Sequence, residues 1–347
     1  MILTVTLNAA LDVTYQIRAL RPGATHRISE VSERPGGKGL NVARVLAALG
    51  HDVTVTGFAG GTTGSTVRDR LATMTGTAAD APDGSGAPRG PGGSDGSHAA
   101  GAATPGSGPV RVHDALVPVA GTTRRTVALV DTGSGETTQL NEPGPAISPE
   151  EWHAFTARYE ELLGASSAVA LCGSLPPGVP VGAYARLVRA AHAASVPVLL
   201  DTSGEPLRRG LAARPDIIKP NADELAELTG SHEPVQASRD ARRRGAHAVV
   251  ASLGARGMLA VTPEGRWRVA PPAGVRGERV RGNTTGAGDS AVAGLLSGLV
   301  EGLPWPKRLV RAAALATSTV LAATAGEFDR RAYRELLGRI EVVETTV

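Results

Sequence analysis

Short apolar runs rich in β-branched residues alternate along the chain with longer segments in which apolar residues recur every three or four positions. The first pattern is typical of buried strands, and the second of helices that pack one face against a sheet. The expected strands are residues 2–7, 52–58, 168–173, 197–201, 216–220 and 247–254. The expected helices are residues 39–49, 149–163, 181–194, 222–229 and 237–244. This alternation predicts an α/β fold of three layers, with helices on both faces of a mostly parallel sheet.

Two regions depart from this rhythm, because polar and apolar residues alternate along them as they do in antiparallel strands. They are residues 13–34 and residues 111–141. The second region contains a hairpin signal around Gly133 and Gly135. We expect the two regions to form a small antiparallel sheet that acts as a lid over the strand ends of the larger sheet.

The segment of residues 76–108 follows neither pattern. It contains ten glycines and no Val, Ile, Leu, Met or aromatic residue. Such a segment buries too little apolar surface to offset the entropy that it would lose on ordering. We therefore predict a disordered, low-complexity insertion. No internal repeat is evident, so residues 1–347 are expected to form a single domain that carries the lid and this insertion.

The composition restricts the partners and the compartment. The 36 basic and 33 acidic residues nearly balance, which does not favour nucleic acid as a partner. The single cysteine, Cys172, excludes an internal disulfide and ends an apolar run, as a buried and inert thiol does. The first residues lack the basic start of a signal peptide, and the apolar stretch 312–326 is too short to span a bilayer. We expect a cytoplasmic protein without a membrane partner.

A glycine-rich turn in the last third of the chain carries the first candidate chemistry. Gly286, Ala287 and Gly288 precede Asp289, and an apolar run with helical spacing follows. Small residues leave backbone N–H groups open to an anion, and the positive end of a helix points the same way. Asp289 could then accept the proton of a hydroxyl group that attacks a phosphate. A bare motif of this kind is nevertheless more often a turn that caps a helix.

A second glycine-rich turn leads into a helix at residues 35–50, with Lys38 and Asn41 at its start. It is not a P-loop, because the pattern GxxxxGK[ST] is absent. Considered alone, the segment is either a capped helix with a flexible entry or a site that offers one cation and one amide to a polyhydroxylated ligand.

Eight stretches, in order along the chain, resemble the signatures of the ribokinase-like carbohydrate kinases, also called the PfkB family. They are TVTLNAALD (4–12), RPGGKGLNVARVLAALG (34–50), TTRRTVAL (122–129), LNEPGP (140–145), CGSLPPGV (172–179), IIKPNADEL (217–225), ASLGARG (251–257) and TTGAGDS (284–290). The resemblance covers nearly the whole chain except residues 76–108, and the chain looks most like the branch of 1-phosphofructokinases and tagatose-6-phosphate kinases. It implies a ribokinase-like α/β/α fold and ATP-dependent phosphorylation of a sugar.

The resemblance also implies roles for residues on the sugar side of the site. Asp289 matches the catalytic base of the family, and Asp12 matches a carboxylate that holds sugar hydroxyls. The anion hole is matched by Gly286, Ala287 and Gly288. The sugar-binding turn is matched by Gly36, Gly37, Lys38 and Asn41. Arg124 matches a lid arginine near the substrate's phosphate, although Arg125 could be the inward one instead.

On the nucleotide side, Asn221 and Glu224 match an NxxE element that organises the Mg²⁺ of ATP, with water between the protein and the ion. Without the resemblance, a helix N-cap with a capping-box acid would explain this pair better. The resemblance also implies a nucleotide-binding turn at Ser252, Gly254 and Gly257. Lys219 could contact nucleotide phosphates or be an ordinary lysine at a strand end.

Three positions depart from the family's pattern. Ala9 replaces a proline, which changes the stiffness of a turn and not its chemistry. His26 stands where this branch often has Asn. Asn283 stands where many relatives have an Asp that helps to bind an activating monovalent cation, so the need for such a cation is open and we expect weak or absent stimulation by K⁺.

These residues together predict a kinase whose partners are ATP, Mg²⁺ and a ketohexose monophosphate, most of all D-fructose 1-phosphate phosphorylated at its 6-hydroxyl. Tagatose 6-phosphate and fructose 6-phosphate are alternatives within the same reaction type. A sugar-phosphate sensor without catalysis is an alternative of a different class, because a fold does not fix a function. The exposed edge of the lid makes a homodimer through two lids plausible.

Overall fold

The computed structural model describes residues 1–76, 110–272, 285–322 and 327–344. The predicted disordered insertion therefore lies outside the described residues, apart from Gly76 at its start. Asn283 also lies outside them. In the part of the chain that is described, no helix is long and apolar enough to cross a membrane.

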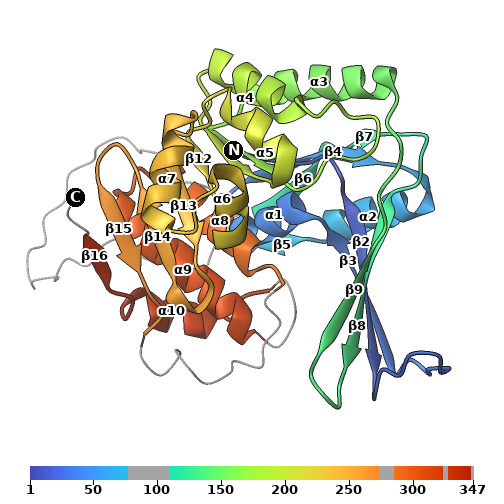
Figure 1. The fold of residues 1–347 in the computed structure, drawn as a ribbon. Coiled ribbons are helices and arrows are strands. Elements are labelled where there is room, and N and C mark those ends of the chain that lie inside the picture. Colours follow the sequence, from blue (N-terminus) through green and yellow to red (C-terminus); the bar gives the residue numbers. More distant parts are fainter. Residues whose placement is uncertain (77–109, 273–284, 323–326, 345–347) are drawn as a thin grey trace, which may run out of the picture.

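A large sheet crosses the middle of the molecule (Figure 1), and its central strands are parallel. These strands are β1 (Ile2–Thr6), β4 (Val53–Ala59), β10 (Ala168–Cys172), β11 (Val198–Asp201), β12 (Ile217–Ile218) and β13 (Ala248–Ser252). Antiparallel strands extend one edge: β14 (Met258–Val261), β15 (Arg266–Val269) and β16 (Val342–Glu344). The other edge consists of β6 (Val110–Asp114), β5 (Thr75–Gly76) and, beside β4, β7 (Val117–Pro118). The mostly parallel sheet predicted from the apolar runs is thus confirmed.

Helices cover both faces of this sheet, as the alternating pattern predicts. One face carries α1 (Lys38–Ala48), α2 (Gly61–Ala72), α8 (Ala287–Val300), α9 (Trp305–Leu321) and α10 (Arg330–Leu337). The other face carries α3 (Pro149–Leu163), α4 (Ala183–Ala193), α5 (Gly204–Leu211), α6 (Ala222–Thr229) and α7 (Pro234–Arg243). Side chains alternate between two cores along each strand, so Ile2 packs into the first core and Leu3 into the second.

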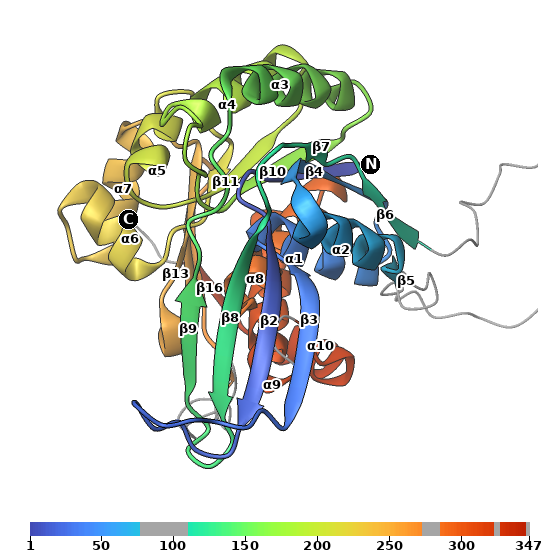
Figure 2. The ribbon, with the colours of Figure 1, turned by 90° about the vertical axis from the view of Figure 1, so that its right-hand side faces the viewer.

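A separate four-stranded sheet projects from the large one (Figure 2). Its order is β3 (Glu30–Gly36), β2 (Ala10–Ile17), β8 (Arg124–Asp131) and β9 (Thr137–Asn141). The β8–β9 hairpin confirms the predicted turn, in which the Asp131 carboxylate accepts hydrogen bonds from the N–H groups of Gly133 and Ser134. The outer pairs are antiparallel, while β2 and β8 pair in parallel.

The predicted range of the lid, residues 111–141, was too wide. Residues Val110–Asp114 and Val117–Pro118 pair with β4 and belong to the large sheet. β6 lies near the edge of that sheet, so Val112 is buried while His113 and Asp114 are exposed. A half-buried strand near an edge shows the same alternation as a strand of an antiparallel sheet, and the pattern alone does not separate the two.

Candidate active site

The parallel strands end at one edge of the large sheet, and the candidate residues gather there and at the root of the lid. In open α/β sheets, ligands bind outside the carboxyl ends of the strands. β1 ends at Thr6, β10 at Cys172, β11 at Asp201 and β13 at Ser252, and Lys219 follows β12. The starts of α1, α6 and α8 face this edge with their own candidate residues.

The first turn of α8 has the form that the glycine-rich motif predicts. Gly286 is the N-cap residue and has a φ of 88°, in the left-handed region that favours glycine. The first helical hydrogen bond in this turn runs from the N–H of Ser290 to the carbonyl of Gly286, at 2.8 Å. The N–H groups of Ala287, Gly288 and Asp289 precede it and have no partner within the helix. These three amides and the positive helix end form a place where an anion is stabilised.

Asp289 occupies the third position of α8 and is buried, with 7% of its surface exposed. Asn41 in α1 donates a hydrogen bond from Nδ2 to Oδ2 of Asp289, at 2.8 Å. Burial raises the pKa of Asp289 to about 6, and repulsion by Asp201 adds to this, while Asn41 and the lysines 38 and 219 lower it. A carboxylate with this pKa is ionised at neutral pH and is a stronger base than an exposed Asp.

Further hydrogen bonds fix the side chain of Asn41. Arg44, one helical turn further along α1, donates from Nη1 to Oδ1 of Asn41 at 3.0 Å. Its Nη2 donates to the carbonyl of Pro35 at 2.8 Å, which ties the helix to the glycine-rich turn before it. Because Arg44 holds the amide oxygen of Asn41, the amide nitrogen faces Asp289. Asn41 thus contacts the proposed base directly.

Asp12 lies on β2 where the lid leaves the large sheet, and it packs against the backbone of Gly36. A Cβ atom at Gly36 would overlap the Asp12 carboxyl group, so a larger residue there would have to displace this carboxyl group. Burial raises the pKa of Asp12 to about 6, while Arg44 and Arg124 lower it. Gly37 next in the turn has a φ of 106° and is the N-cap residue of α1. The predicted sugar-binding turn and carboxylate therefore meet in space.

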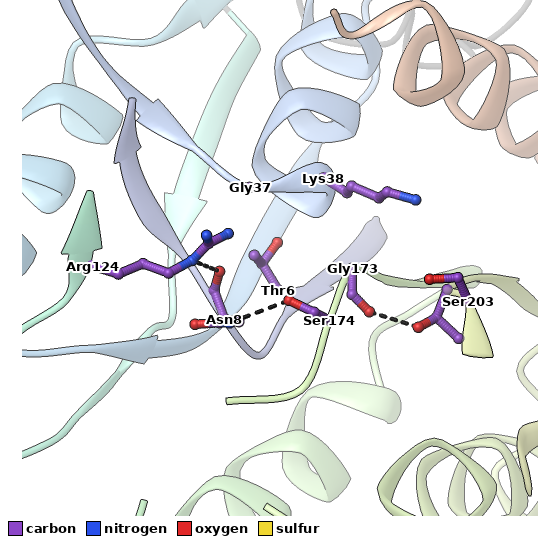
Figure 3. A pocket seen from close by; sticks show the side chains of 9 residues that line it. Thr6, Asn8, Gly37, Lys38, Arg124, Gly173, Ser174 and Ser203 are labelled. Carbon is purple, nitrogen blue, oxygen red and sulfur yellow. Dashed lines mark hydrogen bonds between the residues drawn. The ribbon is translucent and has the colours of Figure 1, made fainter. Parts of the chain in front are cut away.

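A pocket of about 200 Å³ opens beside this turn (Figure 3). It is lined by Thr6, Asn8, Gly37, Lys38, Arg124, Gly173, Ser174, Thr202 and Ser203. Two cationic side chains, Lys38 and Arg124, reach it from different elements, and hydroxyl and amide groups form the rest of its polar lining. Such a lining suits an anionic group with several acceptor oxygens.

The structure decides which of the two lid arginines faces inward. Arg124 lines the pocket, donating from Nε to the carbonyl of Asn8 at 3.2 Å and from Nη1 to that of Glu142 at 3.3 Å. Arg125 is exposed and pairs with the Glu142 carboxylate at 3.0 Å. Asn8 donates from Nδ2 to the Ser174 hydroxyl at 3.2 Å, which joins the two sides of the pocket.

Lys38 and Lys219 approach one buried carboxylate. Their Nζ atoms each lie 3.4 Å from a different oxygen of Asp201, at the end of β11. Burial lowers the pKa of Lys38, but the carboxylates of Asp201, Asp289 and Glu224 outweigh it and leave this pKa above its ordinary value. Lys219 also borders the α8 turn, because a Cβ at Gly288 would lie 3.7 Å from its Nζ.

On the nucleotide side, Asn221 and Glu224 form a complete capping box at the start of α6. Asn221 accepts a hydrogen bond from the N–H of Glu224, and Glu224 accepts one from the N–H of Asn221. The interpretation as a helix cap is therefore correct as geometry, and it leaves the metal-binding role as a prediction. Ser252 pairs with Asn221 in an isolated parallel bridge, which brings the predicted nucleotide turn beside α6. Gly254 and Gly257 in that turn have φ values of 60° and 84°.

The residues on the nucleotide side fit a Mg²⁺ ion that is bound mainly by the nucleotide and less by the protein. Across the described ranges, no cluster of three or more His, Cys, Asp or Glu side chains could hold a metal ion. Glu224 uses one carboxylate oxygen for the helix cap, at 2.9 Å from the N–H of Asn221. A single nearby carboxylate with an amide is the donor set expected for Mg²⁺ that keeps its waters and is bound mainly by nucleotide phosphates.

Eight residues of this site were not predicted from the sequence: Asp201, Arg44 and, in the pocket lining, Thr6, Asn8, Gly173, Ser174, Thr202 and Ser203. Asp201 ends a predicted strand, and Arg44, Asn8 and Ser174 lie within the stretches that resemble the family. An Asp that ends a buried parallel strand, as in PVLLD, was the available signal for Asp201, because strand ends converge on the ligand edge. For Arg44, Asn8 and Ser174, the contacts depend on tertiary packing, and no local signal separates them from their neighbours.

The comparisons with known proteins agree with this fold. The phosphofructokinase-2 of Escherichia coli, solved with potassium, has a TM-score of 0.79 and 26% sequence identity over 97% of this chain and 98% of that chain. Its complex with fructose-6-phosphate has a TM-score of 0.77, with 26% identity and the same coverage. A protein of Thermotoga maritima described as a "possible 1-phosphofructokinase" has a TM-score of 0.77 at 23% identity over all of both chains, and it supports the fold.

The sequence itself matches one family over most of its length. Residues 5–74 and 110–330 match the pfkB family of carbohydrate kinases. The interruption coincides with the low-complexity segment, which lies between β5 and β6. Since the match spans well over half of the chain, the protein belongs to the pfkB family of carbohydrate kinases and is an ATP-dependent sugar kinase.

Proposed function

We propose that this kinase phosphorylates a ketohexose monophosphate, and that the substrate is D-fructose 1-phosphate, converted to fructose 1,6-bisphosphate. The observation that carries the proposal is the pocket beside the glycine-rich turn of α1, whose lining includes both Lys38 and Arg124. Two cations with hydroxyl and amide donors suit an acceptor that already bears a phosphate. A neutral sugar would make no ionic contact with either cation.

The residues divide the reaction between them. Asp12 accepts hydrogen bonds from sugar hydroxyls, and Asp289 accepts the proton of the attacking hydroxyl. The oxygen of that hydroxyl bonds to the γ-phosphorus of ATP while the bond from this phosphorus to ADP breaks. The amides of residues 287–289 and the ammonium of Lys219 stabilise the charge on the transferring group. Bound Mg²⁺ would neutralise phosphate charge, with Asn221 and Glu224 as its protein contacts through water.

The other proposed nucleotide contacts also lie at the carboxyl end of a strand of the large sheet. Ser252, Gly254 and Gly257 form the turn after β13, beside Asn221. We propose that this turn binds the nucleotide, because its glycines keep side chains away from the approach to the backbone. The lid, which carries Asp12 and Arg124, would exclude water from the attacked phosphate.

A coupled assay of ADP release tests the substrate. Fructose 1-phosphate, fructose 6-phosphate and tagatose 6-phosphate are compared with fructose at equal concentration, in the presence of ATP and Mg²⁺. We expect the largest kcat/KM for fructose 1-phosphate and the smallest for fructose, because Lys38 and Arg124 favour the phosphate. A larger value for tagatose 6-phosphate or fructose 6-phosphate would replace the proposed substrate, and preference for fructose would overturn the role of the pocket.

A sensor without catalysis is the alternative from a different class. Such a protein would bind the sugar phosphate and increase its melting temperature without releasing ADP. The buried, hydrogen-bonded Asp289 favours catalysis, since burial of a charged group is costly and is retained here next to an anion-stabilising helix start.

We further propose a cytoplasmic homodimer that pairs two lids. Cys172 is buried, in line with a reducing compartment. Val31 and Leu140 are each 54% exposed, and the strand register puts both on the sheet face opposite Asp12. Val31→Asp should produce monomers in light scattering, whereas Val343→Asp, at the 61% exposed Val343 of β16, should not. A wild-type protein that is already monomeric would contradict the dimer.

The need for a monovalent cation remains tied to Asn283. An amide binds K⁺ less strongly than a carboxylate, so we propose weak or absent stimulation. Turnover in a choline buffer with and without K⁺ tests this, and a rise of many-fold on adding K⁺ would contradict it.

A further inference from the structure

Asp201 is the most deeply buried acidic side chain near the site, and its surroundings are unusual for a charged group. It is 1% exposed, and neither carboxylate oxygen has a hydrogen-bond partner within the described structure. Its contacts there are ion pairs, at 3.4 Å from Oδ2 to Nζ of Lys38 and 3.4 Å from Oδ1 to Nζ of Lys219. A buried carboxylate without hydrogen bonds costs stability, so its presence calls for a function.

The two lysines come from opposite halves of the site. Lys38 starts α1, next to the glycine-rich turn, and its side chain lines the pocket with 39% of its surface exposed. Lys219 follows β12, two residues before Asn221, and it is 5% exposed. Its ammonium borders Gly288 in the first turn of α8. One carboxylate therefore holds a cation of the pocket and a cation of the anion-stabilising turn.

Asp201 also acts on the proposed base at a distance. Its charge is the second cause, after burial, that raises the pKa of Asp289. The ionisable groups that influence Asp289 from the surrounding elements are Asp201 in β11, Lys38 and Arg44 in α1, Lys219 after β12 and Cys172 in β10. Among these groups, Asp201 is the one identified as raising the pKa of Asp289.

We propose that Asp201 is a positioning residue, which holds Lys38 and Lys219 on either side of the transferring phosphoryl group. It does not contact the reacting atoms. Without the negative charge of Asp201, the two ammonium groups would repel each other with no carboxylate between them. Lys38 would then turn away from the acceptor pocket, and Lys219 would turn away from the α8 turn. The kinetic test of this inference rests on the proposed kinase function, whereas the test by melting temperature does not depend on that function.

The first experiment compares Asp201→Asn with Asp216→Asn. Asp216 is a half-buried acid that pairs with His192 at 2.9 Å, and it lies just before β12, away from the site. We expect Asp201→Asn to lower kcat/KM by about 30-fold or more and to raise KM for both substrates. The acid limb of its pH profile, where kcat/KM declines as the pH falls, should move to lower pH by about half a unit, because Asp289 loses a repelling charge. Asp216→Asn should leave the acid limb in place.

Two kinetic results would overturn the proposal. In one, Asp201→Asn loses activity with an unchanged acid limb, which would assign Asp201 a structural role. In the other, raised Mg²⁺ restores the variant fully at an unchanged acid limb, which would make Asp201 a metal contact.

The second experiment measures melting temperatures in a cycle of Asp201→Asn, Lys38→Met and the double variant. If Asp201 neutralises the two lysines, the double variant should have a higher melting temperature than the summed changes of the two single variants predict, because one of the unpaired cations is gone. The same rescue is expected to restore folding if Asp201→Asn alone does not fold. Additive effects, or a double variant that remains unfolded, would overturn the pairing even if the wild-type protein has no kinase activity.

Discussion

Two helices at the ligand edge of the sheet begin with an acid at the same position and use it in opposite ways. In α6, Glu224 accepts a hydrogen bond from the N–H of Asn221, the N-cap residue of its own helix. In α8, Gly286 offers no side chain to cap the helix, and Asp289 instead accepts a hydrogen bond from Asn41 of α1. Glu224 therefore caps its own helix. Asp289 leaves the first amides of α8 open, and a residue from a distant part of the chain holds it.

This difference shows what separates a structural acid from a chemically active one here. Both acids stand at the positive end of a helix. Only Asp289 is buried, and burial with repulsion from Asp201 raises its pKa to about 6. The environment, and not the position in the helix, makes the second carboxylate basic.

The largest effect is expected from Asp289→Asn, which removes the proposed base at nearly constant volume. We expect kcat to fall by about 100- to 10,000-fold, as for the loss of a general base. The melting temperature should stay equal or rise at pH 7. The raised pKa means that the fold disfavours the ionised Asp289, and Asn removes that cost. A variant that keeps most of its turnover would exclude Asp289 as the base.

A smaller effect is expected from Asn41→Leu, which removes the hydrogen bond to Asp289. The wild-type kcat/KM should decline as the pH drops through about 6, where Asp289 takes up a proton. Asn41 lowers the pKa of Asp289, so the variant's acid limb should move to higher pH, and kcat should fall about tenfold at pH 7. A pH profile that does not move would show that Asn41 serves the sugar alone.

Gly288→Ala tests the open amides of α8, and Asp223→Ala is its matched control at the second position of α6. The nearest atom to an added Cβ at Gly288 is Nζ of Lys219, at 3.7 Å, so the fold has room for it. The melting temperature should therefore change little. The methyl group would obstruct the approach of a phosphoryl group, and kcat should drop by about tenfold or less. Equal kcat values for the two variants would refute the anion site.

The smallest effect is expected at Glu224, where two variants separate the cap from the charge. Glu224→Gln keeps a side-chain oxygen for the cap and should melt like the wild type, while KM for MgATP rises by about two- to tenfold. Glu224→Ala should also lose about 1 kcal/mol of stability with its capping box. If Glu224→Gln has wild-type kinetics across a Mg²⁺ titration, Glu224 is a helix cap only.

The layers, the helix starts and the hairpin could be predicted from the sequence because they depend on local pattern. The glycines before Asp289 and the Asn-Glu spacing in α6 likewise indicate helix starts without any tertiary information. The membership of Val110–Asp114 in the large sheet could not be predicted, since a half-buried strand shows the same alternation in either sheet. The glycine-rich motif pointed to Asp289 and the family resemblance to Asp12, but neither distinguished Arg124 from Arg125.

What the sequence by itself determined is therefore the order of elements, two glycine-rich turns at helix starts and an acid directly after one of them. The tertiary structure alone decided that Asn41 meets Asp289 across 248 residues of chain and that Asp201 stands between Lys38 and Lys219. The physical reason is that parallel strands converge at one edge whatever their separation in sequence. Burial, which sets the charge balance there, depends on how every layer packs.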